Sequence, residues 1–240
     1  GSGLIWRSAR TGWNHLYHYA IDGTPIRALT HGEFVVMDVV ADDMEGGWIY
    51  FSAHHDPNRP YDIHLCRVRL SGSELQRLTQ LDGQNVVTMS PAKKTFTVVN
   101  SRPDRPWRTD LHACDGKHLA TVQTADVSGL KSMGHVASEE FTVTAADGKT
   151  ELWGVMHKPG DFDPAKKYPV IDRLYGGPQL AFVSHHFGFG LDALSRIDRA
   201  LAQLGYIVIS VDARGTPERS KAFHDVVYGN WGRNEIPGHG

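Results

Sequence analysis

Hydrophobic and polar positions in the first 135 residues repeat at intervals that suit four short strands. The segments 5–8, 49–52 and 96–99 open three similar copies, and Leu16 and Leu65 mark equivalent positions 49 residues apart. Each copy is rich in aromatic and β-branched residues and contains an Asp-Gly or Ser-Gly hairpin signal. Repeats of about 40 to 50 residues are typical of propeller blades, so we expect about three blades of a β-propeller. An ordinary antiparallel sandwich remains the alternative.

Three blades are too few to close a propeller, which needs about four to eight. The pattern therefore predicts that further blades precede Gly1, unless the fold is not a propeller.

The pattern changes near residue 135, where we place a domain boundary between residues 1–135 and 136–240. Apolar positions alternate on both sides of Asp147-Gly148, which predicts a β-hairpin. Segment 170–175 is predicted to be a short strand, although it contains Asp172 and Arg173, and segment 206–211 is an unbroken apolar run. A helical pattern separates the two, so they should be parallel strands of a βαβ unit.

The predicted helix between these strands places several apolar residues on one face and ends at Gly205. These residues are Leu191, Leu194, Ile197, Leu201 and Leu204. A second helix is expected from Thr216-Pro217-Glu218 to Tyr228, with proline at its first position. The second half is thus predicted to be α/β.

Composition excludes several classes of protein. The net charge of −2 gives no electrostatic reason to expect a nucleic acid partner. No run approaches the roughly 18 apolar residues that span a bilayer, so no membrane segment is expected. Cys66 and Cys114 cannot form a disulfide framework or a zinc site by themselves, and two free thiols are favoured over one bond. The compartment stays open between periplasm and cytoplasm.

Five short motifs follow one another along the chain: Trp13-Asn14-His15-Leu16-Tyr17, Tyr175-Gly176-Gly177-Pro178, Asp212-Ala213-Arg214-Gly215, Phe223-His224-Asp225 and Tyr228-Gly229-Asn230-Trp231-Gly232. In this order they resemble the prolyl oligopeptidase family, and most closely its dipeptidyl peptidase IV-like branch. The resemblance implies a β-propeller followed by an α/β-hydrolase domain, of which this chain would supply the last blades and the first strands. It implies a serine peptidase that removes N-terminal dipeptides after proline or alanine, with a peptide as substrate. Acylaminoacyl peptidase and oligopeptidase activities are close alternatives.

By this resemblance Tyr175 is the one catalytic residue in the chain. It follows a predicted parallel strand, and the family's tyrosine at this place donates its hydroxyl to the oxyanion of the tetrahedral intermediate. Packing against the next turn is its alternative role. Asp212 and Arg214 flank a turn at the next strand end, where they could contact ligand, but we expect Arg214 to hold loop carbonyls in place. His54-His55 and His185-His186 lack the spacing of a metal site, so no metal or cofactor is predicted.

The nucleophile of such a hydrolase lies on a Gly-x-Ser-x-Gly elbow, followed by an acid and a histidine. No such elbow occurs in the 240 residues. A catalytic triad could be assembled only by pairing His224 or His239 with Ser210 or Ser220. The spacing of these residues does not support such a triad. The chain by itself is therefore predicted to be inactive. A non-catalytic propeller-type module that binds peptide or protein is the alternative function, and homodimerisation is left open.

Overall fold

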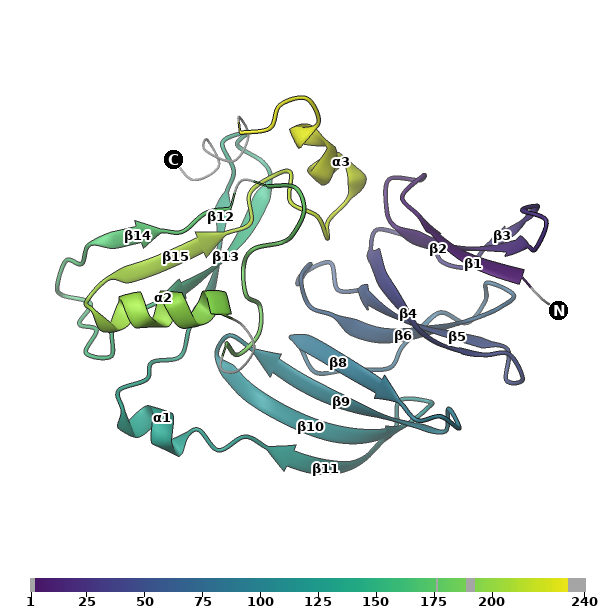
Figure 1. Cartoon of the computed structure of the whole chain (residues 1–240), viewed down its shortest axis with the longest axis horizontal. Helices are drawn as coiled ribbons and strands as arrows, with labels where there is room; N and C mark the ends of the chain where they lie inside the picture. Colours follow the sequence, from purple (N-terminus) through teal and green to yellow (C-terminus); the bar gives the residue numbers. More distant parts are fainter. Residues whose placement is uncertain (1–2, 176, 189–192, 233–240) are drawn as a thin grey trace. The chain divides into compact units, whose positions relative to one another are not determined.

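The computed structural model describes residues 3–175, 177–188 and 193–232. The chain divides into two compact units, the first comprising ranges 1–100, 108–124 and 218–222 and the second 101–107, 125–217 and 223–240. Most contacts of each unit lie within that unit (Figure 1).

Three sheets account for the strands from β1 to β11, and each strand lies beside its neighbour in sequence. The first sheet contains β1 (Gly3–Ser8), β2 (His15–Ala20) and β3 (Pro25–Ala28). The second contains β4 (Val35–Asp43), β5 (Trp48–His54), β6 (His64–Arg69) and β7 (Gln76–Arg77). The third contains β8 (Gln84–Met89), β9 (Thr95–Arg102), β10 (Arg105–Ala113) and β11 (His118–Thr124). Figure 1 shows them following one another from purple to teal. Segments 5–8, 49–52 and 96–99 thus lie in three different sheets, as predicted.

The spacing of 49 residues reappears in the hydrogen bonds of the first two sheets. The backbone N–H of Leu16 donates to Thr30 Oγ1 at 3.0 Å, and that of Leu65 donates to Thr79 Oγ1 at 3.0 Å. The histidine before each leucine contacts the same threonine hydroxyl, at 3.0 Å and 3.2 Å. The sequence repeat is therefore a structural repeat with the same internal bonding.

The middle sheet is covered on both faces because β5 alternates between two cores. Ile49 and Phe51 belong to a cluster with Leu16 of the first sheet. Tyr50 belongs to a second cluster with Phe96 of the third sheet. Burying both faces of a strand requires apolar residues at successive positions, which explains the unbroken run Trp-Ile-Tyr-Phe.

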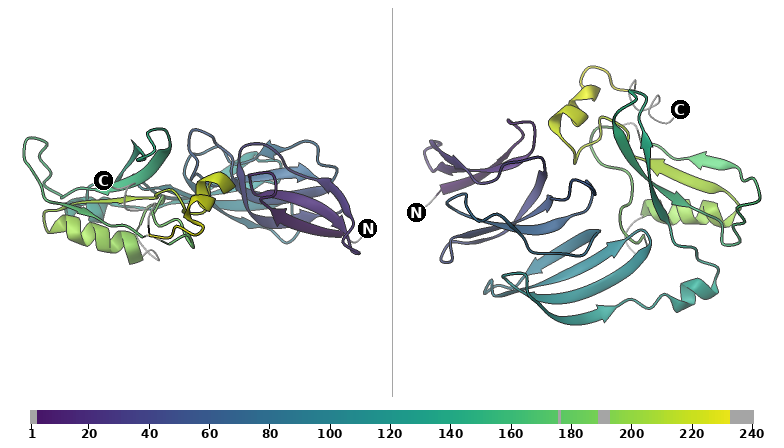
Figure 2. Two further views of the ribbon diagram at one scale, coloured as in Figure 1. Left: turned by 90° about the horizontal axis from the view of Figure 1, so that it is seen from above. Right: turned by 180° about the vertical axis from the view of Figure 1, so that it is seen from behind.

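The second unit is built on a sheet in the order β12-β13-β15-β14. Its strands are β12 (Glu139–Thr144), β13 (Glu151–His157), β14 (Val170–Asp172) and β15 (Ile207–Val211), and its helices are α1 (Ser128–Ser132), α2 (Ala193–Gln203), α3 (Lys221–His224) and the 3₁₀ turn η1 (Asp225–Val227). The hairpin of β12 and β13 is antiparallel, and β14 pairs with β15 in parallel, so both predictions are confirmed. Figure 2 shows α2 along one face of this sheet.

The predicted inner face of α2 is wrong. Ile197 is 50% exposed and Leu204 is 74% exposed, whereas Asp198 and Ala202 are buried. Asp198 is buried because it forms an ion pair with Arg173, directly after β14. An ionic contact thus sets the rotation of this helix where the apolar periodicity predicted otherwise. Leu191 and the side chain of Leu194 lie outside the described part of the chain.

Two predicted elements are shorter than expected. The strand from Val170 ends at Asp172. The helix expected from Thr216 begins at Lys221, because Glu218 has φ +73°, in the left-handed region that ends regular helix. Thr216 instead donates its hydroxyl to the carbonyl of Ala213 at 3.0 Å, so it stabilises a turn.

Both cysteines are free, as favoured from the sequence, and Cys66 is buried. Burial raises the pKa of the Cys66 thiol to about 12. No helix in the described ranges is long and apolar enough to cross a membrane.

Candidate functional site

Tyr175 lies three residues beyond the end of β14 and is 39% exposed. Its ring stacks on Phe182, with the ring centroids 5.7 Å apart and an angle of 17° between planes. Its hydroxyl donates to Gln179 Oε1 at 3.4 Å, which is long for an O–H···O bond. Because the hydrogen bond to Gln179 is weak, the Tyr175 hydroxyl can give it up and donate to an external oxyanion instead.

Gly177 fixes the space available to the tyrosine ring. A Cβ added to Gly177 would meet Gln179 Oε1 first and would also lie 2.7 Å from Tyr175 Cε1, closer than real contacts allow. Any side chain at position 177 would therefore displace the ring of Tyr175.

The segment after the Tyr-Gly-Gly-Pro motif is anchored by a buried carboxylate. Asp212, directly after β15, has no exposed surface. Its Oδ1 accepts the backbone N–H of Phe182 at 2.6 Å and that of Val183 at 3.3 Å. Arg173 lies over the ring of Phe182, 4.5 Å from its centroid. The support for Tyr175 thus comes from the ends of two neighbouring parallel strands.

A buried histidine bonds to the same carboxylate. His185 Nδ1 lies 3.2 Å from Glu140 Oε1, and its Nε2 lies 3.9 Å from Asp212 Oδ2. Burial acts to lower the pKa of His185, but its hydrogen bonds to Asp212 and Glu140 outweigh burial and raise the pKa above its usual value. A protonated His185 therefore fits between the two carboxylates.

A hollow of about 310 Å³ lies beside the Tyr-Gly-Gly-Pro motif. It is lined by Pro178, His224, Asp225, Val227, Tyr228, Gly229 and Trp231. The Nε2 of His224 donates to the carbonyl of Pro178 at 3.2 Å, which links α3 to the motif. Residues from three of the sequence motifs thus meet here.

Sequence reasoning missed a buried line of serine, histidine and aspartate. Ser138 Oγ lies 2.9 Å from His157 Nδ1, and His157 Nε2 lies 3.8 Å from Asp198 Oδ2. A serine in this chain therefore does have a base beside it. However, Ser138 is 1% exposed and leaves no path for a substrate carbonyl. The line is an internal polar network between β12, β13 and α2.

The other polar residues singled out from the sequence have structural contacts. Arg214 Nη1 pairs with Asp147 Oδ2 at 2.9 Å, at the turn of the β12–β13 hairpin. The pKa of Asp147 is lowered to about 2, first by its hydrogen bonds with Thr150. His54 Nδ1 bonds to the carbonyl of Asp62 at 3.1 Å. Among the described residues, no group of three or more His, Cys, Asp or Glu side chains could hold a metal ion.

Comparison with protein families gives two matches. Residues 1–107 match the dipeptidyl peptidase IV N-terminal region, and residues 194–238 match the prolyl oligopeptidase family.

Similar proteins agree with these matches. The chain is 33% identical to a probable dipeptidyl-aminopeptidase B of Emericella nidulans, covering 93% of this chain and 25% of the relative. It is 32% identical to dipeptidyl-aminopeptidase B of Aspergillus niger, with the same shares covered. The chain thus spans about a quarter of the length of these curated relatives.

Solved structures share the fold. The crystal structure of dipeptidyl peptidase 4 from Porphyromonas gingivalis superimposes with a TM-score of 0.78 at 24% identity, covering 95% of this chain and 31% of that chain. A putative dipeptidyl aminopeptidase IV from Bacteroides ovatus gives the same score and identity, covering 94% of this chain and 34% of that one.

Proposed function

Because the chain belongs to the prolyl oligopeptidase family, in its dipeptidyl peptidase IV-like branch, we propose that it forms part of a serine peptidase that releases N-terminal dipeptides after proline or alanine. The named relatives support the dipeptidyl activity, and the position of Tyr175 supports its chemistry. The nucleophile would lie outside these 240 residues, since no Gly-x-Ser-x-Gly elbow occurs within them.

We assign residues 1–135 to propeller blades and residues 136–240 to the start of the α/β-hydrolase domain. The three sheets of sequentially ordered strands support the first assignment. The parallel pair β14–β15 and the family match over 194–238 support the second.

The proposed role of Tyr175 follows from its exposed and weakly bonded hydroxyl. When a serine oxygen attacks the scissile carbonyl, the C=O bond opens and negative charge develops on its oxygen. Tyr175 donates a hydrogen bond to this oxyanion and keeps its proton. Collapse of the intermediate expels the amine, which takes the serine's proton, and water later hydrolyses the acyl-enzyme.

Replacing Tyr175 by Phe tests this role in the peptidase that carries the chain. The change removes one hydroxyl and little volume, so kcat should fall by roughly 10²- to 10³-fold with little change in KM. Tyr19→Phe in β2 is the control and should keep wild-type kinetics. A Tyr175→Phe enzyme that retains most of its kcat would make Tyr175 a packing residue. A wild-type protein with no turnover of dipeptidyl substrates would favour the alternative, a binding module.

A further inference from the structure

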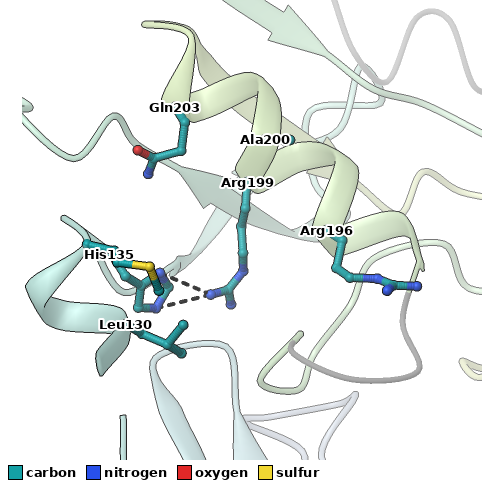
Figure 3. A pocket seen from close by; sticks show the side chains of 7 residues that line it. Leu130, His135, Arg196, Arg199, Ala200 and Gln203 are labelled. Atoms are coloured by element: carbon teal, nitrogen blue, oxygen red, sulfur yellow. Dashed lines mark hydrogen bonds between the residues drawn. The ribbon is translucent and has the colours of Figure 1, made fainter. Parts of the chain in front are cut away.

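A second hollow, of about 320 Å³, lies beside α2. Its other side is formed by α1 and the residues that follow α1. Figure 3 shows its lining side chains. They are Leu130, Met133, His135, Arg196, Arg199, Ala200 and Gln203. None of these lining residues takes part in the site around Tyr175, so the hollow needs its own explanation.

One wall of this hollow is cationic. Arg199 reaches from α2 toward His135, and its Nη1 lies 3.1 Å and 3.3 Å from the two ring nitrogens (Figure 3). Phe187 supports the guanidinium, with 5.0 Å between the Arg199 Cζ and the ring centroid. Arg196 lies three residues earlier, about one turn along the helix. These contacts hold one positive charge in a defined place. Arg196 adds a second positive charge to the lining, but its side chain extends away from that of Arg199 (Figure 3).

The one carboxylate between these two arginines, that of Asp198, faces the sheet and not the hollow. Asp198 stands between the two arginines in sequence, but it is 3% exposed and pairs with Arg173 at the sheet. Burial and the charge of Arg199 lower the pKa of His135, so this ring is neutral at neutral pH. None of the described lining residues carries a carboxylate.

The opposite wall is apolar. Leu130 belongs to α1, and Met133 follows it with 71% of its surface exposed. Methionine is flexible and adapts to ligands of different shape. Ala200 keeps the floor open because its side chain is small, and Gln203 adds an amide at the edge. An apolar wall facing guanidinium groups suits a molecule that has both an apolar body and an anionic end.

We propose that this hollow binds a small carboxylate attached to a branched or linear apolar group, with the carboxylate at Arg199 and the apolar group at Leu130 and Met133. The C-terminal leucine of a peptide and a medium-chain fatty acid share this chemistry. This site is separate from the proposed peptidase function and does not depend on it.

Isothermal titration of the 240-residue chain with N-acetyl-leucine tests the proposal. We expect binding with a dissociation constant on the order of millimolar, as for other weakly held small ligands. N-acetyl-leucinamide, which has the same shape without the charge, should bind at least about 10-fold more weakly. Acetate, which lacks the apolar group, should also bind more weakly. Decanoate in a parallel titration distinguishes the sources, since the tighter of the two ligands identifies either a peptide terminus or a fatty acid.

Two variants locate the binding. Arg196→Gln should weaken N-acetyl-leucine binding by about 3- to 10-fold, because one of the two positive charges that line the hollow is lost. Ala200→Phe fills the hollow from an exposed helix position and should abolish binding without disturbing the core. Lys117→Gln removes an equal charge from the turn before β11 and is the matched control. Equal binding of the acid and the amide, or unchanged binding in both α2 variants, would overturn the proposal.

Discussion

The carboxylate of Asp212 accepts the backbone N–H of Phe182 at 2.6 Å, and the ring of Phe182 stacks on Tyr175. A fully buried charge at the end of β15 thereby fixes the ring against which the proposed oxyanion donor rests. Preorganisation of this kind gives a donor its catalytic value, because no reorganisation is needed when charge develops.

Asp212→Asn should lower the free energy of unfolding by about 1 to 3 kcal/mol. The amide keeps the volume but weakens the charge-assisted bonds to Phe182 and Val183 and removes one of the two carboxylates that bond to His185. Urea denaturation at neutral pH measures the change. Glu45→Gln, at an exposed position, is the control and should change stability little. An Asp212→Asn protein as stable as wild type would show that this anchor contributes nothing.

Gly177→Ala should reduce kcat in the peptidase that carries this chain, because the added Cβ would displace the Tyr175 ring. We expect a loss of about 10- to 100-fold. The double variant Gly177→Ala/Tyr175→Phe isolates the cause. If the ring is the target, the alanine should add little once the hydroxyl is gone. Full additivity of the two losses would assign the effect of Gly177→Ala to some other contact.

Acid should destabilise the first unit through His64. Burial, followed by the charge of Arg77, lowers the pKa of His64 to about 4. The unfolded chain binds this proton below pH about 6.5 and the folded chain does not, so stability falls as pH drops from about 6.5 to 4, by up to roughly 3 kcal/mol. In His64→Gln, the urea midpoints measured at pH 7 and at pH 4.5 should differ less than they do in wild type. The exposed variant His31→Gln should keep the wild-type slope, and an unchanged slope in His64→Gln would contradict the assignment.

His185 should have the opposite effect on the pH dependence of stability. Its folded pKa is raised, so its contribution is complete below pH 6.5 and is lost as pH rises through the folded value. His185→Gln should therefore lose more stability at pH 6 than at pH 9. The same denaturation series measures this, and a loss that is equal at both values would show that His185 is neutral in the folded protein.

The repeat could be predicted from sequence spacing, but the register of its first strand could not. The segments 5–8 and 49–52 look alike when Trp6 is aligned with Tyr50. In the structure Trp6 pairs with Tyr17, and Phe51 pairs with Cys66, 49 residues after Tyr17. Trp6 therefore corresponds to Phe51. Strand register depends on the length of the intervening turn, and a shift of one residue exchanges the two faces of a strand.

The functional site also contains some features that could be predicted from the sequence and others that could not. Tyr175 could be proposed from the sequence because its motif is local and stands in a fixed order relative to the other motifs. The ion pair of Asp198 and Arg173 could not, since apolar periodicity gives no weight to a charge that is buried with a partner. The burial of His157 could not be predicted either, because its hydrogen-bond partner Ser138 is 19 residues away in sequence.

The most direct test asks whether any serine of these 240 residues is an activated nucleophile. We propose that the chain supplies an oxyanion donor but not the nucleophile. Two described serines have a histidine beside them: Ser138 is 1% exposed, and Ser184 Oγ lies 3.5 Å from His186 Nδ1, which is too long for an activating hydrogen bond. Incubation of the chain with a fluorophosphonate, followed by mass spectrometry, should leave its mass unchanged, because phosphonylation needs an activated hydroxyl that the reagent can reach. A stoichiometric adduct on any serine, Ser138 included, would contradict the claim that the nucleophile lies outside this chain.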